Sequence, residues 1–240
     1  MRFIPSLTLA LATLTVACTA APMSFPPTRP TPATLPTLAT CKDYVLISSR
    51  GTQERQGPSF IFKDIIKDVL QALPNGAEVD TVYPADWGMH FEIGSDWIFQ
   101  YITKSLASCP QQKFALLGWS QGAMVSSGAI QKFAESRSAA KNSIKAAVFF
   151  GNPFHVPHRV GNVDEHGQFT TSAVSGIASY GNPNAATSFA QQGKLLDICF
   201  EGDTICNRAR SSDPAAHGKY GARPQITKMS VDFLLKHLRE

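Results

Sequence analysis

The stretch LLGWSQGAMV, residues 116–125, decides the fold that we expect for this chain. Its first two leucines are typical of the end of a buried strand, and its last three residues are typical of the start of a helix. Only residues 118–122 lie between them, and Ser120 has a glycine two positions away on either side. The pattern predicts a sharp strand-to-helix turn that holds Ser120 in a strained conformation, exposed above a sheet.

Strand-like and helix-like segments alternate from Cys41 onward, which indicates a parallel sheet with helices on both faces. The expected strands are residues 43–49, 78–84, 113–119, 145–151 and 194–200. The expected helices lie within residues 59–73 and 95–108, directly after Ser120, and within residues 225–238. Reactive groups of such sheets gather beyond the carboxyl ends of the strands. Six residues are expected beyond these strand ends: Arg50, Gly51, Thr52, Ser120, Asn152 and Asp203.

The first 40 residues differ in composition from the rest of the chain. A basic residue, an apolar run too short to span a bilayer comfortably and then small residues have the layout of a secretory signal peptide, which we expect at residues 1–20. Residues 21–40 are rich in proline and threonine and predict a flexible linker. A lipid anchor on Cys18 is the alternative, although Thr15 stands where a leucine is usual. We therefore expect a secreted protein with one folded domain at residues 41–240.

Cysteine content and charge set further bounds on this 240-residue chain. Four cysteines remain after the expected signal peptide, and paired thiols are expected in an oxidising compartment. Three pairings are possible; Cys41 with Cys109 and Cys199 with Cys206 is the economical one, since the second pair is close in the chain and flanks a turn. A net charge of +4 without a lysine or arginine run argues against nucleic acid as a partner. We expect a monomer without stable membrane insertion.

A serine hydroxyl becomes a nucleophile when a base removes its proton, and the base needs a carboxylate to orient it. Asp203, in CFEGDTIC, and His217, in DPAAHGKY, follow Ser120 in the serine, acid, histidine order of strand-to-helix hydrolases. The alternative for Asp203 is a simple turn residue. A bond between Cys199 and Cys206 would hold the loop that presents Asp203. The sequence thus predicts a catalytic triad of Ser120, His217 and Asp203.

Three other histidines compete with His217 for the role of base. His155, His158 and His166 lie upstream of the proposed acid, in GNPFHVPHRVGNVDEHG, and fit a loop or the edge of a cleft. Their spacing raises the question of a metal, but no cysteine or carboxylate cluster joins them in a zinc-like pattern. We expect neither a metal nor a cofactor.

Acyl transfer also needs donors aimed at the oxygen that becomes negative in the tetrahedral intermediate. The amide of Gln121 directly follows the proposed nucleophile and begins a helix, so it is free to donate. The second donor is expected in the loop after the first strand, SSRGTQERQG, where Thr52 offers an amide and a hydroxyl. The alternative for this loop is a charged, solvated turn, at least at Gln53 and Arg55.

Taken together, these motifs resemble the fungal cutinases and cutinase-like serine esterases, the carbohydrate esterase family that also includes acetylxylan esterases. The resemblance covers most of residues 41–238 and rests on RGTQE, CP, GWSQGA, GNP, DICFEGDTIC and AAHGKY. It implies a compact, α/β-hydrolase-like three-layer sandwich around a five-stranded parallel sheet. It also implies the triad, an oxyanion hole from Thr52 and Gln121, and both disulfides.

Departures from the family pattern bear on the substrate. The family usually has tyrosine where this chain has Trp119, a residue that we place in the substrate cleft. The segment between acid and histidine carries Arg208 and Arg210, whereas cutinases have an apolar flap there. The opposite rim, ADWGMHFEIGSDW, either receives an acyl chain or packs against the second helix. Its cleft candidates are Trp87, Met89 and Phe91.

The sequence therefore predicts a secreted serine esterase that forms an acyl-enzyme. Its expected substrates are carboxylic esters, either a cutin-type polyester or acyl esters of short to medium length. One alternative is an acetylxylan-type polysaccharide deacetylase, in which the polar flap faces sugar. Another is a wall-binding or effector protein that keeps the fold without turnover, against which the intact triad argues.

Overall fold

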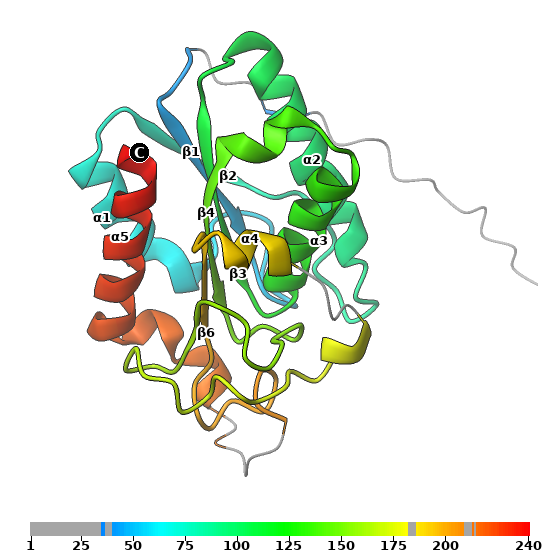
Figure 1. Ribbon diagram of the computed structural model, residues 1–240, viewed down its shortest axis with the longest axis vertical. Coiled ribbons are helices and arrows are strands. Elements are labelled where there is room, and N and C mark those ends of the chain that lie inside the picture. Colours follow the sequence, from blue (N-terminus) through cyan, green and yellow to red (C-terminus); the bar gives the residue numbers. More distant parts are fainter. Residues whose placement is uncertain (1–34, 37–39, 182–185, 209–212, 214) are drawn as a thin grey trace, which may run out of the picture. The chain divides into compact units, whose positions relative to one another are not determined.

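One parallel sheet of six strands lies at the centre of the fold, in the order β2-β1-β3-β4-β6-β5. Figure 1 shows the sheet between the helices. Its strands are β1 (Tyr44–Ser49), β2 (Gly76–Asp80), β3 (Lys113–Trp119), β4 (Ile144–Phe150), β5 (Asn162–Val163) and β6 (Leu195–Ile198). The inner strands are buried on both faces, which explains the nearly unbroken apolar runs that predicted them. The three-layer α/β class is confirmed.

The computed structural model describes residues 35–36, 40–181, 186–208, 213 and 215–240. The expected signal peptide and nearly all of the expected linker lie outside these residues, as does Arg210.

The sheet has one strand more than the five that the sequence predicts. The extra strand, β5, pairs with β6 through Asn162 opposite Asp197 and Val163 opposite Ile198. It has two residues and no apolar run, so hydrophobic periodicity carries no signal for it. The chain also leaves β2 at Asp80, earlier than predicted, although the Thr81 N–H still donates to the Ser48 carbonyl of β1 at 2.9 Å.

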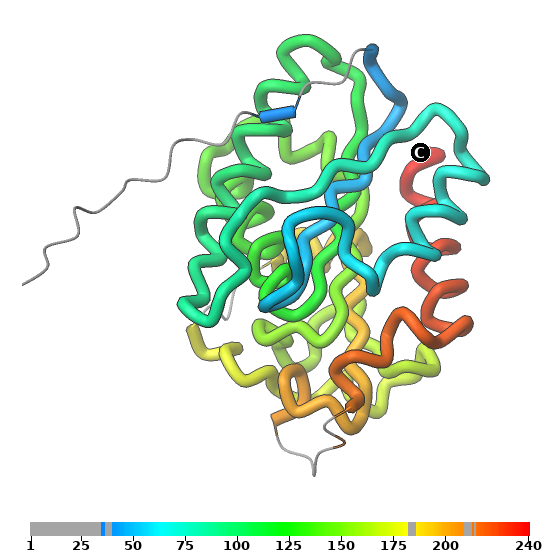
Figure 2. The backbone as a smooth tube through the Cα atoms, turned by 180° about the vertical axis from the view of Figure 1, so that it is seen from behind, coloured from blue at the N-terminus to red at the C-terminus, as the bar shows by residue number. Residues whose placement is uncertain are grey.

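Helices cover both faces of the sheet (Figures 1 and 2). On one face lie α1 (Lys63–Ala72) and α5 (Pro224–Arg239). On the other lie α2 (Phe91–Ser108), α3 (Gln121–Glu135) and α4 (Thr187–Gln191). Short 3₁₀ helices occupy Phe60–Phe62, Ala139–Ser143, Ser179–Gly181, Ala216–Gly218 and Tyr220–Ala222. In the part of the chain that the structure describes, no helix has both the length and the apolar character needed to cross a membrane.

Successive residues of the inner strands supply two separate cores, as β1 shows. Val45 and Ile47 of β1 enter the core beneath α2 and α3, whereas Leu46 enters the core beneath α1 and α5. The Cys41–Cys109 disulfide joins the chain just before β1 to the end of α2. This bond lies at the amino ends of the strands and leaves their carboxyl ends free for the loops described below.

The edge strand β2 carries two poorly solvated carboxyl groups. Glu78 and Asp80 alternate with Val79, whose side chain enters the core. Glu78 Oε1 and Asp80 Oδ1 are buried without a hydrogen-bond partner among the described residues. Burial, and then the charge of Asp80, raises the pKa of Glu78 to about 7. The folded protein therefore keeps a proton on Glu78 at pH values where the unfolded chain has lost it.

Replacing Glu78 with Gln should increase stability at high pH. Between the unfolded pKa and the folded pKa of about 7, the wild type loses stability as the pH rises, because its unfolded state ionises first. The Glu78→Gln variant lacks this titration, so its gain in melting temperature should be larger at about pH 8 than at about pH 4.5. Glu135→Gln, on the exposed end of α3, is the control and should show no such trend. An equal difference in melting temperature between Glu78→Gln and the wild type at both pH values would contradict the raised pKa of Glu78.

Candidate active site

Ser120 occupies the turn between β3 and α3 with φ 56° and ψ −121°, a backbone conformation that residues with a Cβ rarely adopt. The two flanking glycines allow the close approach that this turn requires. A Cβ on Gly118 would lie 2.5 Å from the carbonyl oxygen of Gly122, and a Cβ on Gly122 would lie 2.0 Å from that of Ser49. The Ser120 N–H donates to the Phe150 carbonyl at 2.9 Å, which ties the turn to β4.

The turn differs in one respect from the prediction. Ser120 is not openly exposed, because only 9% of its surface remains accessible. The carboxyl ends of β1 and β4 crowd the turn on both sides, through Ser49 and Phe150. Ser120 is therefore largely covered at the end of β3.

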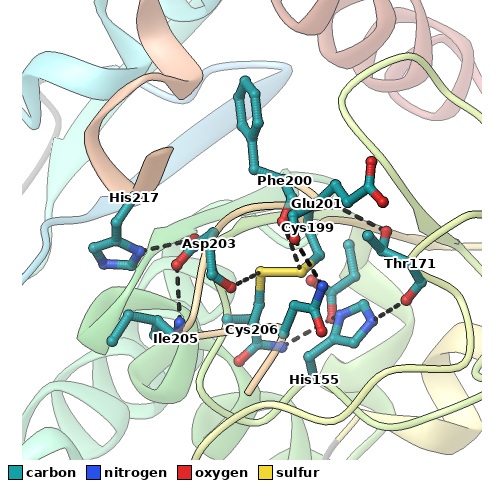
Figure 3. Close-up of a disulfide and its surroundings, with 12 residues drawn as sticks. His155, Thr171, Cys199, Phe200, Glu201, Asp203, Ile205, Cys206 and His217 are labelled. Carbon is teal, nitrogen blue, oxygen red and sulfur yellow. Dashed lines mark hydrogen bonds and ion pairs between the residues drawn. A yellow bond between two sulfur atoms is a disulfide. The ribbon is translucent and has the colours of Figure 1, made fainter. Parts of the chain in front are cut away.

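Asp203 and His217 form a hydrogen-bonded pair, with His217 Nδ1 2.9 Å from Asp203 Oδ2 (Figure 3). The Asp203 side chain is fully buried, whereas the His217 side chain remains 25% exposed. With Nδ1–H donated to the carboxylate, Nε2 of the ring is left as an acceptor, as a general base requires.

Asp203 is further held by two donors that the sequence reasoning did not identify. Tyr220 Oη donates to Asp203 Oδ2 at 2.6 Å, and the Ile205 N–H donates to Oδ1 at 2.9 Å. Burial, and then the charge of Asp203, raises the pKa of Tyr220 well above its ordinary value, so its hydroxyl stays a donor. The feature of the sequence that points to Tyr220 is its position at the end of AAHGKY, three residues after His217 and thus one 3₁₀ turn away.

The loop that carries Asp203 is closed by the Cys199–Cys206 disulfide (Figure 3). Both cysteines are buried, and Thr171 Oγ1 donates to the Cys199 carbonyl at 3.0 Å. The structure contains this disulfide and the Cys41–Cys109 disulfide, the pairing expected from the sequence. Asp203 is thus presented from a loop with little freedom to move.

Trp119, the residue before Ser120, contacts His217. The two rings are 5.4 Å apart, and Trp119 Nε1 donates to the His217 carbonyl at 2.9 Å. The structure therefore brings His217 and Asp203 to the strand end that carries Ser120. Trp119, which we expect in the substrate cleft, is largely buried, with 9% of the residue exposed, the same fraction as for Ser120.

The two residues expected to form the oxyanion hole also meet. Thr52 Oγ1 donates to Gln121 Oε1 at 3.4 Å, and Gln121 Nε2 donates to the Asp86 carbonyl at 3.2 Å. The backbone N–H of Gln121 lies in the first turn of α3, where no earlier helical carbonyl can accept it. The Gln53 N–H donates to the Ala85 carbonyl at 2.7 Å, which fixes the loop of Thr52 against its neighbour.

The loop of Thr52 is supported from beneath by two charged side chains that point inward. The guanidinium of Arg50, a residue that is 4% exposed, donates to the carbonyls of Glu54 at 2.9 Å, of Thr81 at 3.2 Å and of Tyr83. The Glu54 carboxylate accepts the Gly51 N–H and the hydroxyl of Ser59. Gln53 and Arg55 are exposed, as the solvated-turn alternative expects, and so is Gln56.

The residues expected to line the substrate cleft divide into two groups. Trp87 is 77% exposed. Met89 and Phe91 are half-buried and pack against Met124 and Phe154, with the rings of Phe91 and Phe154 5.5 Å apart. Both residues therefore contact α3 and the loop after β4.

Arg208 stacks on the ring of Tyr180, with its guanidinium carbon 4.7 Å from the ring centroid. Its guanidinium also donates to Tyr180 Oη at 3.2 Å. The polar flap is thus linked to the exposed 3₁₀ helix at Ser179–Gly181.

His155 lies in a loop, one of the two positions predicted for it, but it is fully buried and not at the edge of a cleft. Its Nδ1 is 3.1 Å from Asp197 Oδ2, which also accepts Asn152 Nδ2 at 3.0 Å and a guanidinium N–H of Arg159. Asn152 is likewise fully buried and lies just after the carboxyl end of β4. His158 and His166 are exposed, and the described residues contain no group of three or more histidine, cysteine or acidic side chains that could hold a metal ion.

Comparison with known proteins places this geometry in a family. The cutinase family model matches residues 40–238, so the chain belongs to the cutinase family. Cutinase 4 of Emericella nidulans is 31% identical over 141 residues, which are 57% of this chain and 59% of that protein's length. The probable carboxylesterase Culp3 of Mycobacterium tuberculosis is 25% identical over 83% of this chain and 70% of its own.

Solved structures show the same fold. A cutinase-like protein from Cryptococcus sp. is 33% identical, with a TM-score of 0.76 over 81% of this chain and 94% of its own. The catalytic core domain of acetyl xylan esterase from Trichoderma reesei is 22% identical, with a TM-score of 0.65 over 82% of this chain and 100% of its own. At that identity, the second likeness concerns the fold alone.

Removing the Cys199–Cys206 disulfide should lower the rate of ester hydrolysis strongly, with only a small loss in the free energy of unfolding. In a Cys199→Ser/Cys206→Ser variant, Asp203 is less firmly held against His217, and a misplacement of about 1 Å can cost roughly 100-fold in rate. The matched control is Cys41→Ser/Cys109→Ser, which opens a longer loop at the far end of the sheet. The control should lose more stability than the Cys199→Ser/Cys206→Ser variant, because the stabilisation by a disulfide grows with the length of the loop that it closes. It should nevertheless keep more activity. Equal aryl-ester hydrolysis by both folded variants would contradict this role.

Proposed function

We propose that this protein is a secreted serine esterase that hydrolyses carboxylic esters through a Ser120, His217, Asp203 triad. The observation that carries the proposal is the Asp203–His217 pair, held beside Trp119 at the strand end where Ser120 has its strained conformation. Membership of the cutinase family, and relatives named cutinase and carboxylesterase, support ester hydrolysis.

In the proposed reaction His217 accepts the Ser120 proton at Nε2 while Ser120 Oγ attacks the ester carbonyl carbon. The negative oxygen of the tetrahedral intermediate accepts hydrogen bonds from the Gln121 N–H and from Thr52. His217 then gives its proton to the departing alcohol, and the acyl group remains on Ser120. Water activated by His217 releases the acid and restores the serine. Asp203 stays ionised throughout and stabilises the imidazolium.

The rims favour acyl esters of short to medium length. Exposed Trp87 offers apolar surface on one side, whereas the flap with Arg208 offers a polar one. A deacetylase of acetylated polysaccharide is the second candidate, and the exposed Arg208–Tyr180 pair favours it because both groups bind hydroxyls. A non-catalytic wall-binding protein would need none of the buried support around Asp203.

The rest of the chain fits a secreted enzyme. We assign residues 1–20 to a signal peptide, 21–40 to a linker and 41–240 to the esterase domain. Two disulfides are typical of proteins that fold in oxidising compartments. The proposed enzyme acts as a monomer on an ester substrate, without nucleic acid and without a cofactor.

Replacing Ser120 with Ala should reduce aryl-ester hydrolysis by several orders of magnitude, because only binding and oxyanion stabilisation remain, together worth roughly 10³ to 10⁴ over water. His217→Ala should have a comparable effect. The control His166→Ala, at an exposed loop position, should keep most of the rate. Near-normal turnover by a folded Ser120→Ala variant would falsify the mechanism.

The chain-length preference should depend on Arg208. Each buried methylene contributes up to about 0.8 kcal/mol, so a cleft with one apolar wall should gain on the first few carbons only. We expect kcat/KM on aryl esters to peak at short to medium acyl chains, and Arg208→Leu to move the peak to longer ones. Arg239→Leu, at the exposed end of α5, is the control. An unchanged profile in Arg208→Leu would show that the flap does not touch the acyl chain.

A further inference from the structure

The Trp119 indole lies between the two loops that complete the proposed catalytic machinery. At one edge its Nε1 donates to the His217 carbonyl at 2.9 Å, and the indole and imidazole planes are inclined by 33° with centroids 5.4 Å apart. This bond is to the backbone of the histidine loop, so it positions the peptide unit from which the imidazole projects.

The opposite edge of the same indole rests on the loop that carries Thr52. A Cβ placed on Gly51 would lie 2.4 Å from Trp119 Cε3 and 2.6 Å from Cζ3. Such distances leave no room for any side chain at Gly51, so the ring is packed directly on the backbone next to Thr52. The benzo edge therefore sets how closely this loop can approach β3.

A third contact closes the ring off from solvent. Phe60 packs its edge against Trp119, with ring centroids 5.3 Å apart and planes at 75°. Phe60 is itself 60% exposed, so it covers the indole from outside while Trp119 keeps only 9% of its surface accessible. A buried, rigid ring with one donor has few ways to move.

From these contacts we infer that Trp119 is a positioning residue that fixes the spacing between the His217 loop and the Thr52 loop across Ser120. The inference rests on the proposed function and assigns Trp119 a role that acts through its contacts with these two loops. Its chemical consequence follows from the steep dependence of rate on geometry: both the proton acceptor and the oxyanion donors must be within hydrogen-bonding reach of one tetrahedral centre.

The first test compares Trp119→Phe with Trp97→Phe. Trp97 is a suitable control because it is also buried, at 5% exposed, but lies in α2 with its Nε1 unpaired among the described residues. Trp119→Phe keeps an aromatic ring and loses the donor to His217. We expect kcat to fall about 10-fold with KM nearly unchanged, because the loss of one hydrogen bond that positions His217 raises the reaction barrier by about that factor in rate. Trp97→Phe should keep the wild-type kcat, even where both variants lose similar stability.

The second test uses the contact with Gly51. Gly51→Ala forces its new Cβ into the indole, so activity should fall sharply. Adding Trp119→Leu removes the ring that the Cβ meets, and the double variant should be more active than Gly51→Ala alone. A double variant that is less active than either single variant would overturn the inference.

Labelling with a fluorophosphonate separates the inference from the proposed function. If wild-type protein is not labelled, the proposed esterase itself fails. If the wild type is labelled, and Trp119→Phe matches Trp97→Phe in labelling rate and kcat, only the positioning role of Trp119 is overturned. Slower labelling of Trp119→Phe alone is the result that the inference requires.

Discussion

The backbone strain at Ser120 is the constraint on which the rest of the site depends. Its positive φ is retained because Gly118 and Gly122 let β3, α3 and the end of β1 approach more closely than side chains would permit. The apolar cores on both faces of the sheet supply the packing that holds this turn. Any relaxation of the turn would move Ser120 relative to every loop that surrounds it.

The loops around Ser120 are held mainly by buried polar groups. Asp203 is fixed by Tyr220, by a backbone N–H and by a disulfide, and the loop of Thr52 is fixed by Arg50 and Glu54. Buried hydrogen bonds to charged groups are strong, and leaving one such group unpaired is costly. The result is a set of donors and acceptors already in place before a substrate arrives, which is what electrostatic stabilisation of a transition state needs.

The sequence predicted those features whose signals are local. The strand, serine and helix around Ser120 are contiguous, and the inner strands are apolar runs, so both could be read from the chain. Tyr220 and the contact of Trp119 with His217 were missed because they depend on which residues meet after folding. His155 lies in a loop, as predicted, but its burial could not be predicted, since nothing in the neighbouring sequence reveals that Asp197 of β6 would pair with it. The two-residue strand β5 carries no periodic pattern at all.

The most direct test of the account is to identify the residue that an active-site reagent modifies. Wild-type protein is treated with a fluorophosphonate, digested, and mapped by peptide mass spectrometry. The account predicts one covalent adduct, on Ser120, that forms much more slowly in His217→Ala and is absent from Ser120→Ala. An adduct on a different residue, or labelling that is unaffected by His217→Ala in a folded protein, would contradict it.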